Sequence, residues 1–269
     1  MSIVVNTNIG SLNAQRSLAE SSRELSTAME RLSSGKKINS AADDAAGFAI
    51  AERMTAQVRG LNMATKNAND GLAMLATIEN ATNDVTDMLQ RIRELAVQAA
   101  NDTNGTQDRT YLQNEVDSLV AEINRVSTDT VYNDSVVLDG NLSGSLQVGT
   151  ASGQVIDFAI DSIDATTLGV NALDLSDATN AATALTAIDA AIETVAGNRA
   201  GYGALSNRLE YTVSNLMNVA EFTTAARSRI EDADFAAESA RLAKAQVLQQ
   251  TGTAMLAQAN ASSQLAIQL

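Results

Sequence analysis

Residues 18–32, LAESSRELSTAMERL, decide which fold this chain can form. Small or apolar side chains recur there at alternating spacings of three and four residues, which places them on one face of a helix. Residues 248–269, LQQTGTAMLAQANASSQLAIQL, repeat this spacing at the other end of the sequence. The two stripes are Leu18, Ser21, Leu25, Ala28 and Leu32, and Leu248, Gly252, Met255, Ala259, Ser262, Ala266 and Leu269.

A narrow apolar stripe on a helix is typical of the seam of a coiled coil. The stripe remains exposed to water unless a second helix covers it. We therefore expect the two stripes to pair with each other, with both termini at the same end. A chain whose terminal segments are its contact surfaces suits an assembly subunit better than an enzyme. The residues predicted to form these polymerisation stripes are Leu18, Leu25, Leu32, Leu248, Met255 and Leu269.

The composition favours a thin helical bundle without enzymatic chemistry. The 269 residues include no Pro, Cys, His or Trp, and aromatic residues make up 3%. Without Pro, very long unbroken helices are possible, and without large rings a thick core is hard to fill. The lack of Cys and His removes disulfides, thiolate and imidazole metal ligands, and the commonest nucleophiles and bases. We predict no catalytic residue, no cofactor-binding residue, no cofactor and no metal ligand.

The net charge of −14 disfavours binding to nucleic acid or to an anionic membrane. No Lys or Arg occurs between Arg125 and Arg199, where ten carboxylates lie, and we interpret this segment as a solvated surface. A sharper interpretation is an outward surface that keeps neighbouring particles apart. No run of 18 apolar residues is present, so no transmembrane helix is expected. The start lacks a basic n-region, so no signal peptide is expected, which alone would suggest a cytoplasmic protein.

The periodicity predicts several long helices and one β region. Helices are expected over 4–32, over 41–100, around 112–126, from 177 onward and again from about 234. Two short strands are expected at 145–148 and 155–160, joined by a turn at 149–153. Gly47, Gly60 and Gly71 interrupt the second helix, and we interpret them as places where another helix approaches closely. Asp43 and Asp44 are interpreted as residues of a helix N-terminus, not as a catalytic pair.

The expected fold is mainly α, an elongated antiparallel helical bundle or coiled coil with a small β-hairpin region and the termini paired at one end. One domain is expected to combine residues 1–42 with 228–269 as a terminal coiled-coil core. The second is a helical bundle over 43–227, with the β excursion at about 129–176.

Long strings at both ends of the chain resemble the signatures of bacterial flagellin. Near the start, Asn6-Thr7-Asn8, ERLSSGKKINSAADDAAG (30–47) and RIRELAVQAAN (91–101) resemble the amino-terminal blocks of that family. Near the end, the matching strings are NRLE (207–210), SRIEDAD (228–234) and GTAMLAQAN (252–260). The resemblance covers roughly residues 1–140 and 180–269. Only 40–50 residues lie between these parts, so the chain resembles a minimal member without large outer domains.

The resemblance implies a structural subunit that polymerises into the extracellular flagellar filament used for swimming. It also implies export through the flagellar channel without a cleaved signal peptide, which reconciles the missing signal with an outside location. The implied partners are other copies of the chain, flagellar cap and junction proteins, an export chaperone at the carboxy-terminal segment, and the Toll-like receptor for flagellin. Neither nucleic acid nor a membrane is an expected partner. The family's receptor contact corresponds to Arg91, Leu95 and Glu115.

One string departs from the family pattern, since the usual aromatic-Asn-Gly turn is Tyr132-Asn133-Asp134 here. Two other functions remain open at this stage. A hook–filament junction protein shares the design of the terminal segments. A membrane-active helical secreted protein is a more distant alternative, because it needs a long apolar hairpin that the sequence lacks.

Overall fold

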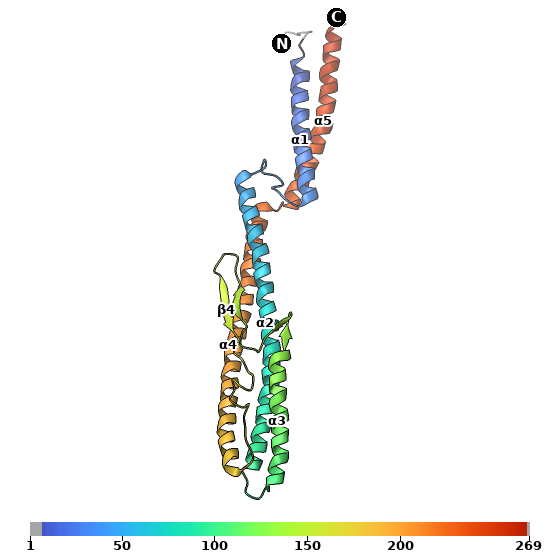
Figure 1. The fold of residues 1–269 in the computed structure, drawn as a ribbon. Helices are drawn as coiled ribbons and strands as arrows, with labels where there is room; N and C mark the ends of the chain where they lie inside the picture. Colours follow the sequence, from blue (N-terminus) through green and yellow to red (C-terminus); the bar gives the residue numbers. More distant parts are fainter. Residues whose placement is uncertain (1–6, 268–269) are drawn as a thin grey trace. The chain divides into compact units, whose positions relative to one another are not determined.

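A computed structural model of the chain describes residues 7–267, with side chains described up to residue 261 (Figure 1). Two compact units are present: residues up to Val58 together with those from Glu221 onward, and Arg59–Ala220. The units divide inside two long helices, not at the expected boundaries of 42/43 and 227/228. In chain order the elements are α1 (Ile9–Ser34), α2 (Ala45–Ala99), α3 (Thr106–Asp129), β1 (Val131–Tyr132), β2 (Ser135–Val136), β3 (Ser143–Gln147), β4 (Val155–Ala159), α4 (Ala178–Glu231) and α5 (Phe235–Ile267).

In the first unit, α1 and α5 lie side by side and antiparallel (Figure 1), as the terminal stripes predicted. The Asn8 amide donates a hydrogen bond to the Ala259 carbonyl (2.8 Å), while Arg31 contacts Glu238 near the other end of α1. Asn8 also caps α1 by accepting a hydrogen bond from the Ser11 N–H (3.0 Å). The helix therefore begins at Ile9, later than predicted, and positions 4–6 lie outside the described residues.

The two adjacent aspartates organise the start of α2, as the sequence indicated. Asp44 Oδ1 accepts a hydrogen bond from the Gly47 N–H (2.9 Å) and so caps the helix, which begins at Ala45 and not at Ala41. Asp43 Oδ2 accepts hydrogen bonds from the backbone N–H groups of Ser40 and Asn39. These donors stabilise the carboxylate and lower the pKa of Asp43 from its ordinary value.

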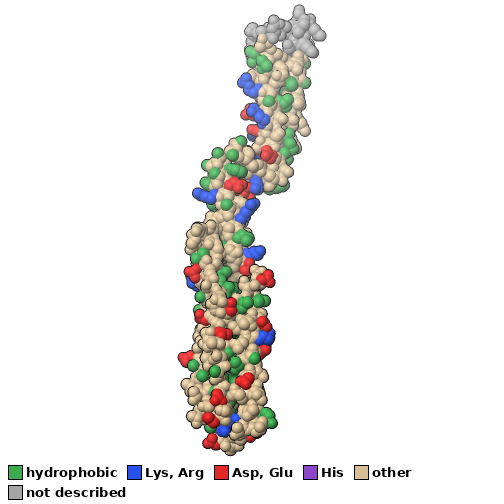
Figure 2. Space-filling view, viewed as in Figure 1, with side chains coloured by type: hydrophobic (Ala, Val, Ile, Leu, Met, Phe, Trp, Pro, Cys, Tyr) green, Lys and Arg blue, Asp and Glu red, His purple; other side chains and the backbone are tan. Residues whose placement is uncertain are grey.

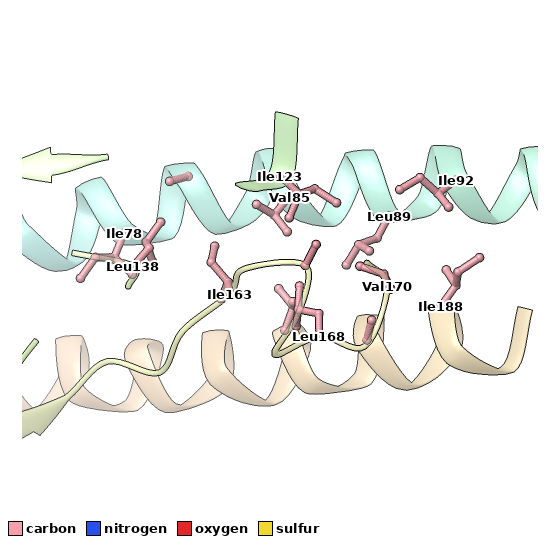
Figure 3. Close-up of a cluster of buried hydrophobic side chains, with 14 of the residues drawn as sticks. Ile78, Val85, Leu89, Ile92, Ile123, Leu138, Ile163, Leu168, Val170 and Ile188 are labelled. Atoms are coloured by element: carbon pink, nitrogen blue, oxygen red, sulfur yellow. The ribbon is translucent and has the colours of Figure 1, made fainter. Parts of the chain in front are cut away.

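In the second unit, α2, α3 and α4 pack around one apolar core (Figure 1). Arg91 of α2 reaches Glu115 of α3, and Arg199 of α4 reaches Glu79 of α2, so neighbouring helices are also linked by ion pairs. Figure 3 shows the middle of this core, where apolar side chains of α2 and α4 face each other across an irregular segment. The labelled residues are Ile78, Val85, Leu89, Ile92, Ile123, Leu138, Ile163, Leu168, Val170 and Ile188.

The irregular segment 160–175 fills space between α2 and α4 (Figure 3). Its apolar side chains are buried, although the segment had been interpreted as an outward acidic surface. Asp157 and Asp161 are exposed, but the Asp164 carboxylate is partly buried and accepts a hydrogen bond from Ser162 Oγ (2.7 Å). The segment is therefore one wall of the core with acidic side chains on its outer side. Its buried residues are Ile160, Ile163, Ala165, Leu168, Val170 and Leu175.

Strands β3 and β4 form an antiparallel hairpin within a residue or two of the predicted strands. A second, smaller hairpin, β1 with β2, was not predicted. Its two turn residues, Asn133 and Asp134, have φ values of 48° and 63°. Left-handed conformations at both central positions are typical of a type I′ turn. Such turns favour Asn at the first central position and Gly at the second.

Two of the α2 glycines mark close approaches, but the approaching element is the β3–β4 hairpin and not a helix. A Cβ at Gly71 would lie 2.5 Å from Leu146 Cδ1, and one at Gly60 would lie 2.8 Å from Thr150 Cγ2. The side chain of Asn67 donates a hydrogen bond to the Gln147 carbonyl (3.1 Å) between these two contacts. The missing side chains therefore let the hairpin lie directly on α2.

Candidate functional site

The seam between α1 and α5 is made mostly of small side chains. Leu18, Leu25 and Leu32 are half-buried on the α1 side, so the α1 stripe faces α5 as predicted. Leu18 packs on Gly252, where an added Cβ would lie 3.3 Å from Leu18 Cδ1. Small residues let two helices approach closely but bury little apolar area. The most buried residues of the seam are Ser11, Ser21, Ala28, Glu238 and Ala245.

The predicted α5 stripe combines residues of two faces: Gly252 and Ala259 meet α1, whereas Leu248 and Met255 do not. Leu248 is 40% exposed and Met255 63% exposed, because the face of α5 that meets α1 carries smaller side chains at heptad spacing. Leu269 lies outside the described residues. Leu248 and Met255 instead border an open groove beside the seam, together with Ser17 and Ser21 of α1. The heptad residues on the paired face are Glu238, Ala245, Gly252 and Ala259.

Large apolar side chains are exposed across the first unit, and Figure 2 shows hydrophobic side chains at its surface. Seven of them lie on α1 and α5, and Ile50 of α2 and Phe222 of α4 complete the set. An apolar surface of this kind marks an interaction site in a soluble protein. The exposed large apolar residues here are Ile9, Leu12, Met29, Ile50, Phe222, Phe235, Val247, Leu248 and Met255.

The second candidate surface lies where α2 meets α3. Arg91 donates hydrogen bonds from Nε (3.0 Å) and Nη2 (2.9 Å) to Glu115 Oε1, and from Nη1 to Glu94 Oε2 (2.9 Å). The carboxylates of Glu94 and Glu115 raise the pKa of Arg91 from its ordinary value. The side chain of Arg91 is half exposed, and that of Glu115 is 44% exposed. Two of the three predicted receptor-contact residues are thus paired and accessible.

The third of these residues, Leu95, does not offer a contact surface. Only 2% of Leu95 is exposed, and it packs in the core of the second unit. Leu95 therefore does not share the exposed surface of Arg91 and Glu115, and its expected role as a receptor contact stays a prediction. Leu95 continues the core-facing stripe of Val85 and Ile92, and this spacing in the sequence already indicated burial.

The predicted stripes left out three buried seam residues, Ser11, Ala245 and Glu238. The side chain of Glu238 is 6% exposed and contacts Arg31 and Arg241. Its position one heptad before Ala245 was the signal that could have placed it in the seam. Within residues 7–267, no acidic cluster suited to a metal ion is found. In the same described part, none of the helices is apolar enough over a sufficient length to span a membrane.

Comparison with known proteins accounts for this arrangement. The family model of the bacterial flagellin N-terminal helical region matches residues 5–143, and that of the C-terminal helical region matches residues 185–269. The chain belongs to the bacterial flagellin family. It is 42% identical over 270 residues to a flagellin of Halalkalibacterium halodurans, an alignment that covers 99% of each chain.

Solved structures show the same fold. The crystal structure of Bacillus cereus flagellin matches with a TM-score of 0.51 and 30% identity, covering 56% of this chain and 88% of that one. A putative flagellar hook-associated protein from Vibrio parahaemolyticus matches with a TM-score of 0.61, covering 71% of this chain and 100% of that one. Its identity is 16%, so this likeness concerns the fold alone.

This flagellin is a structural subunit that polymerises with other copies into the extracellular flagellar filament, whose role is motility. It is not an enzyme. The predicted mainly α fold and the predicted family are confirmed. A junction protein and a membrane-active protein are not favoured, because the similarity to flagellin extends over almost the whole chain.

Proposed function

We propose that the outer faces of the α1–α5 pair are the polymerisation surface, with Leu248 and Met255 buried against neighbouring subunits. The observation that carries this proposal is the exposure of these two large apolar side chains on a helix pair whose own seam does not include them. Burying one such side chain is worth about 1.5–3 kcal/mol. A filament would bury them in every subunit.

The distribution of charge also favours the terminal unit as the polymerisation surface. Residues 59–220 contain 21 acidic and eight basic residues, whereas the remaining segments contain 11 and ten. The nearly neutral unit can be packed closely against copies of itself with little electrostatic cost. The acidic unit is better suited to face solvent, where repulsion keeps neighbouring filaments apart.

Truncation and substitution together test the proposal. Removal of residues 235–269 should leave a soluble chain that forms no filaments when seeded with native fragments. Leu248→Asn/Met255→Asn should raise the critical concentration for polymerisation at least about tenfold, because about 1.4 kcal/mol corresponds to a factor of ten. The matched control Leu248→Ile/Met255→Leu keeps both side chains apolar and should polymerise nearly normally. Equal critical concentrations for the two double variants would contradict the proposal.

We also propose that Arg91 and Glu115 contribute to recognition by the Toll-like receptor for flagellin. Both side chains are accessible, and Arg is a frequent hot-spot residue in protein interfaces. Leu95 contributes only indirectly, by holding α2 against the core. Receptor activation by monomers, compared with that by intact filaments, tests whether assembly hides this surface.

The remaining partners follow from family membership. We propose that the carboxy-terminal segment binds an export chaperone before assembly, and that cap and junction proteins contact the same terminal helices at the filament end. Loss of chaperone binding on removal of residues 235–269 would support the first part. Export without cleavage is tested by the amino-terminal mass of subunits recovered from filaments, which should begin at Met1 or Ser2.

A further inference from the structure

We infer that the ion pair between Arg31 and Glu238 sets the register in which α1 and α5 pair. The pair lies in the seam near the end of α1, with Arg31 Nη1 3.3 Å from Glu238 Oε1. The Glu238 side chain is 6% exposed and that of Arg31 21% exposed. The register matters because it decides which α1 residues stand beside Leu248 and Met255 on the outer faces of the pair.

The rest of the seam discriminates poorly between registers. Ser21, Ala28, Ala245 and Gly252 are all small, so a slide by one heptad brings another small residue opposite each of them. Knobs-into-holes packing repeats with the heptad, and a polar residue in the seam is what specifies the register.

Leu18, Leu25 and Leu32 also face α5, but they recur every seven residues. A one-heptad slide therefore again places Leu18 opposite a small residue, Ala245 or Ala259. The heptad register of this seam therefore needs a second source of specificity.

Both one-heptad slides disrupt the ion pair. A slide in one direction places Arg31 opposite Ala245, which leaves the guanidinium half-buried without its carboxylate. A slide in the other direction brings Glu238 opposite Glu24, so that two carboxylates share the seam. The first arrangement leaves the Arg31 guanidinium without the carboxylate it contacts, and the second places two carboxylates against each other although Glu238 keeps Arg241 on its own helix. Both are unfavourable for largely buried charges.

The environment of the pair strengthens this discrimination. Glu238 Oε2 also accepts a hydrogen bond from Arg241 Nη1 (3.0 Å) on its own helix. Within the described residues, Arg31 Nε is buried and has no hydrogen-bond partner. In the part of the chain that the structure describes, Glu238 is the carboxylate in ion-pair contact with Arg31, while Asp43 interacts with Arg31 at longer range. Buried ion pairs add little net stability, and specifying register is their best-attested use.

The absence of Cys makes the register directly measurable. The Leu18 Cβ lies 3.9 Å from the position of a Cβ at Gly252, which is within the range for a disulfide. Leu18→Cys/Gly252→Cys therefore reports the native register. Leu18→Cys/Ala245→Cys and Leu18→Cys/Ala259→Cys report the two one-heptad slides. Filaments are assembled under reducing conditions and then oxidised, and intramolecular disulfides are quantified by peptide mass mapping.

With Arg31 and Glu238 in place, the native reporter should cross-link at least about tenfold more than either slide reporter, a difference of about 1.4 kcal/mol. In Arg31→Met/Glu238→Leu the ratio should fall at least about threefold, while the filament melting temperature stays level or rises, because an apolar pair can replace a buried ion pair. This combination separates a register role from a merely stabilising one. An unchanged ratio in this double variant overturns the inference.

If the double variant does not polymerise, Glu238→Gln provides the same test with nearly the same side-chain volume. Its cross-link ratio should also fall, and an unchanged ratio again overturns the inference. Glu30→Gln is the matched control, because Glu30 is exposed on α1 next to Arg31 but outside the seam. Its ratio should equal that of the native background.

Discussion

Arg91 and Glu115 join α2 to α3 through two hydrogen bonds that converge on a single carboxylate oxygen. Both side chains are about half exposed, so water and salt screen this pair and it adds little to folding stability. The same two residues are the accessible part of the proposed receptor contact. A structural and a recognition role can therefore be separated by experiment.

Exchanging the two charges tests the recognition role. Arg91→Glu/Glu115→Arg keeps an ion pair between the helices, and exposed pairs add little to stability, so the urea midpoint of unfolding should stay close to the native value. Receptor activation by the monomer should nevertheless fall at least about tenfold, since the partner would meet reversed charges. Arg91→Ala should lose a similar share of the signal. Native-like dose–response curves for the exchanged variant would contradict the assignment.

Leu95 should behave as a core residue and not as a contact residue. Leu95→Ala removes a fully packed side chain and should lower the free energy of unfolding by about 2–5 kcal/mol, as measured in urea. Receptor activation, corrected for the folded fraction, should stay within about twofold of the native value. A large loss of signal from fully folded Leu95→Ala would restore Leu95 to the receptor contact.

Glycine-to-alanine substitutions should change stability in opposite directions on two helices. Gly71→Ala should destabilise by about 1–3 kcal/mol, because its Cβ would overlap Leu146 of the β3–β4 hairpin. Gly201→Ala should stabilise by about 0.5–1 kcal/mol, because no atom lies near its Cβ and alanine favours the helix. Thermal unfolding of both variants checks this, and equal shifts would mean that the hairpin does not rest on α2.

The β1–β2 turn offers a stabilising change. Asp134 has a φ of 63°, and a left-handed conformation costs a residue with a Cβ about 1–2 kcal/mol. Asp134→Gly should therefore raise the melting temperature of the monomer by a few degrees. Asp134→Ala is the matched control. It keeps a Cβ at the left-handed position, so it should not stabilise the protein. A lower melting temperature for Asp134→Gly would argue against a type I′ turn.

Acid should weaken the second unit partly through Asp164. Hydrogen bonds, first from Thr167 and then from Ser162, lower the pKa of Asp164 from its ordinary value. A lowered folded-state pKa contributes stability that is present above the unfolded value and is lost as pH falls through the folded one. The loss should thus begin near pH 4 and continue below it. Urea unfolding as a function of pH should show a shallower decline for Asp164→Asn than for the native chain.

Local sequence patterns were sufficient to predict the helices, the β3–β4 hairpin and the pairing of the terminal segments, and the resemblance of particular segments to flagellin predicted the family. The spacing of apolar residues that predicts a helix is visible within a short stretch of sequence. An apolar stripe such as Leu18, Leu25 and Leu32 predicts that another segment packs against it. The absence of Pro and the strings shared with flagellin are likewise properties of the chain alone. These features required no knowledge of which segments meet.

Only the tertiary structure decided which faces meet. α5 carries small or apolar residues on several sides, so spacing could not distinguish the paired face of Ala245 and Gly252 from the exposed face of Leu248 and Met255. The segment 160–175 has no helical or strand period, and its burial between α2 and α4 depends on long-range contacts. The close approach at Gly71 likewise depends on a hairpin far away in sequence. The burial of a residue depends on the segments that pack against it, and these can be far away in the sequence. The residues next to it in the sequence therefore do not determine its burial.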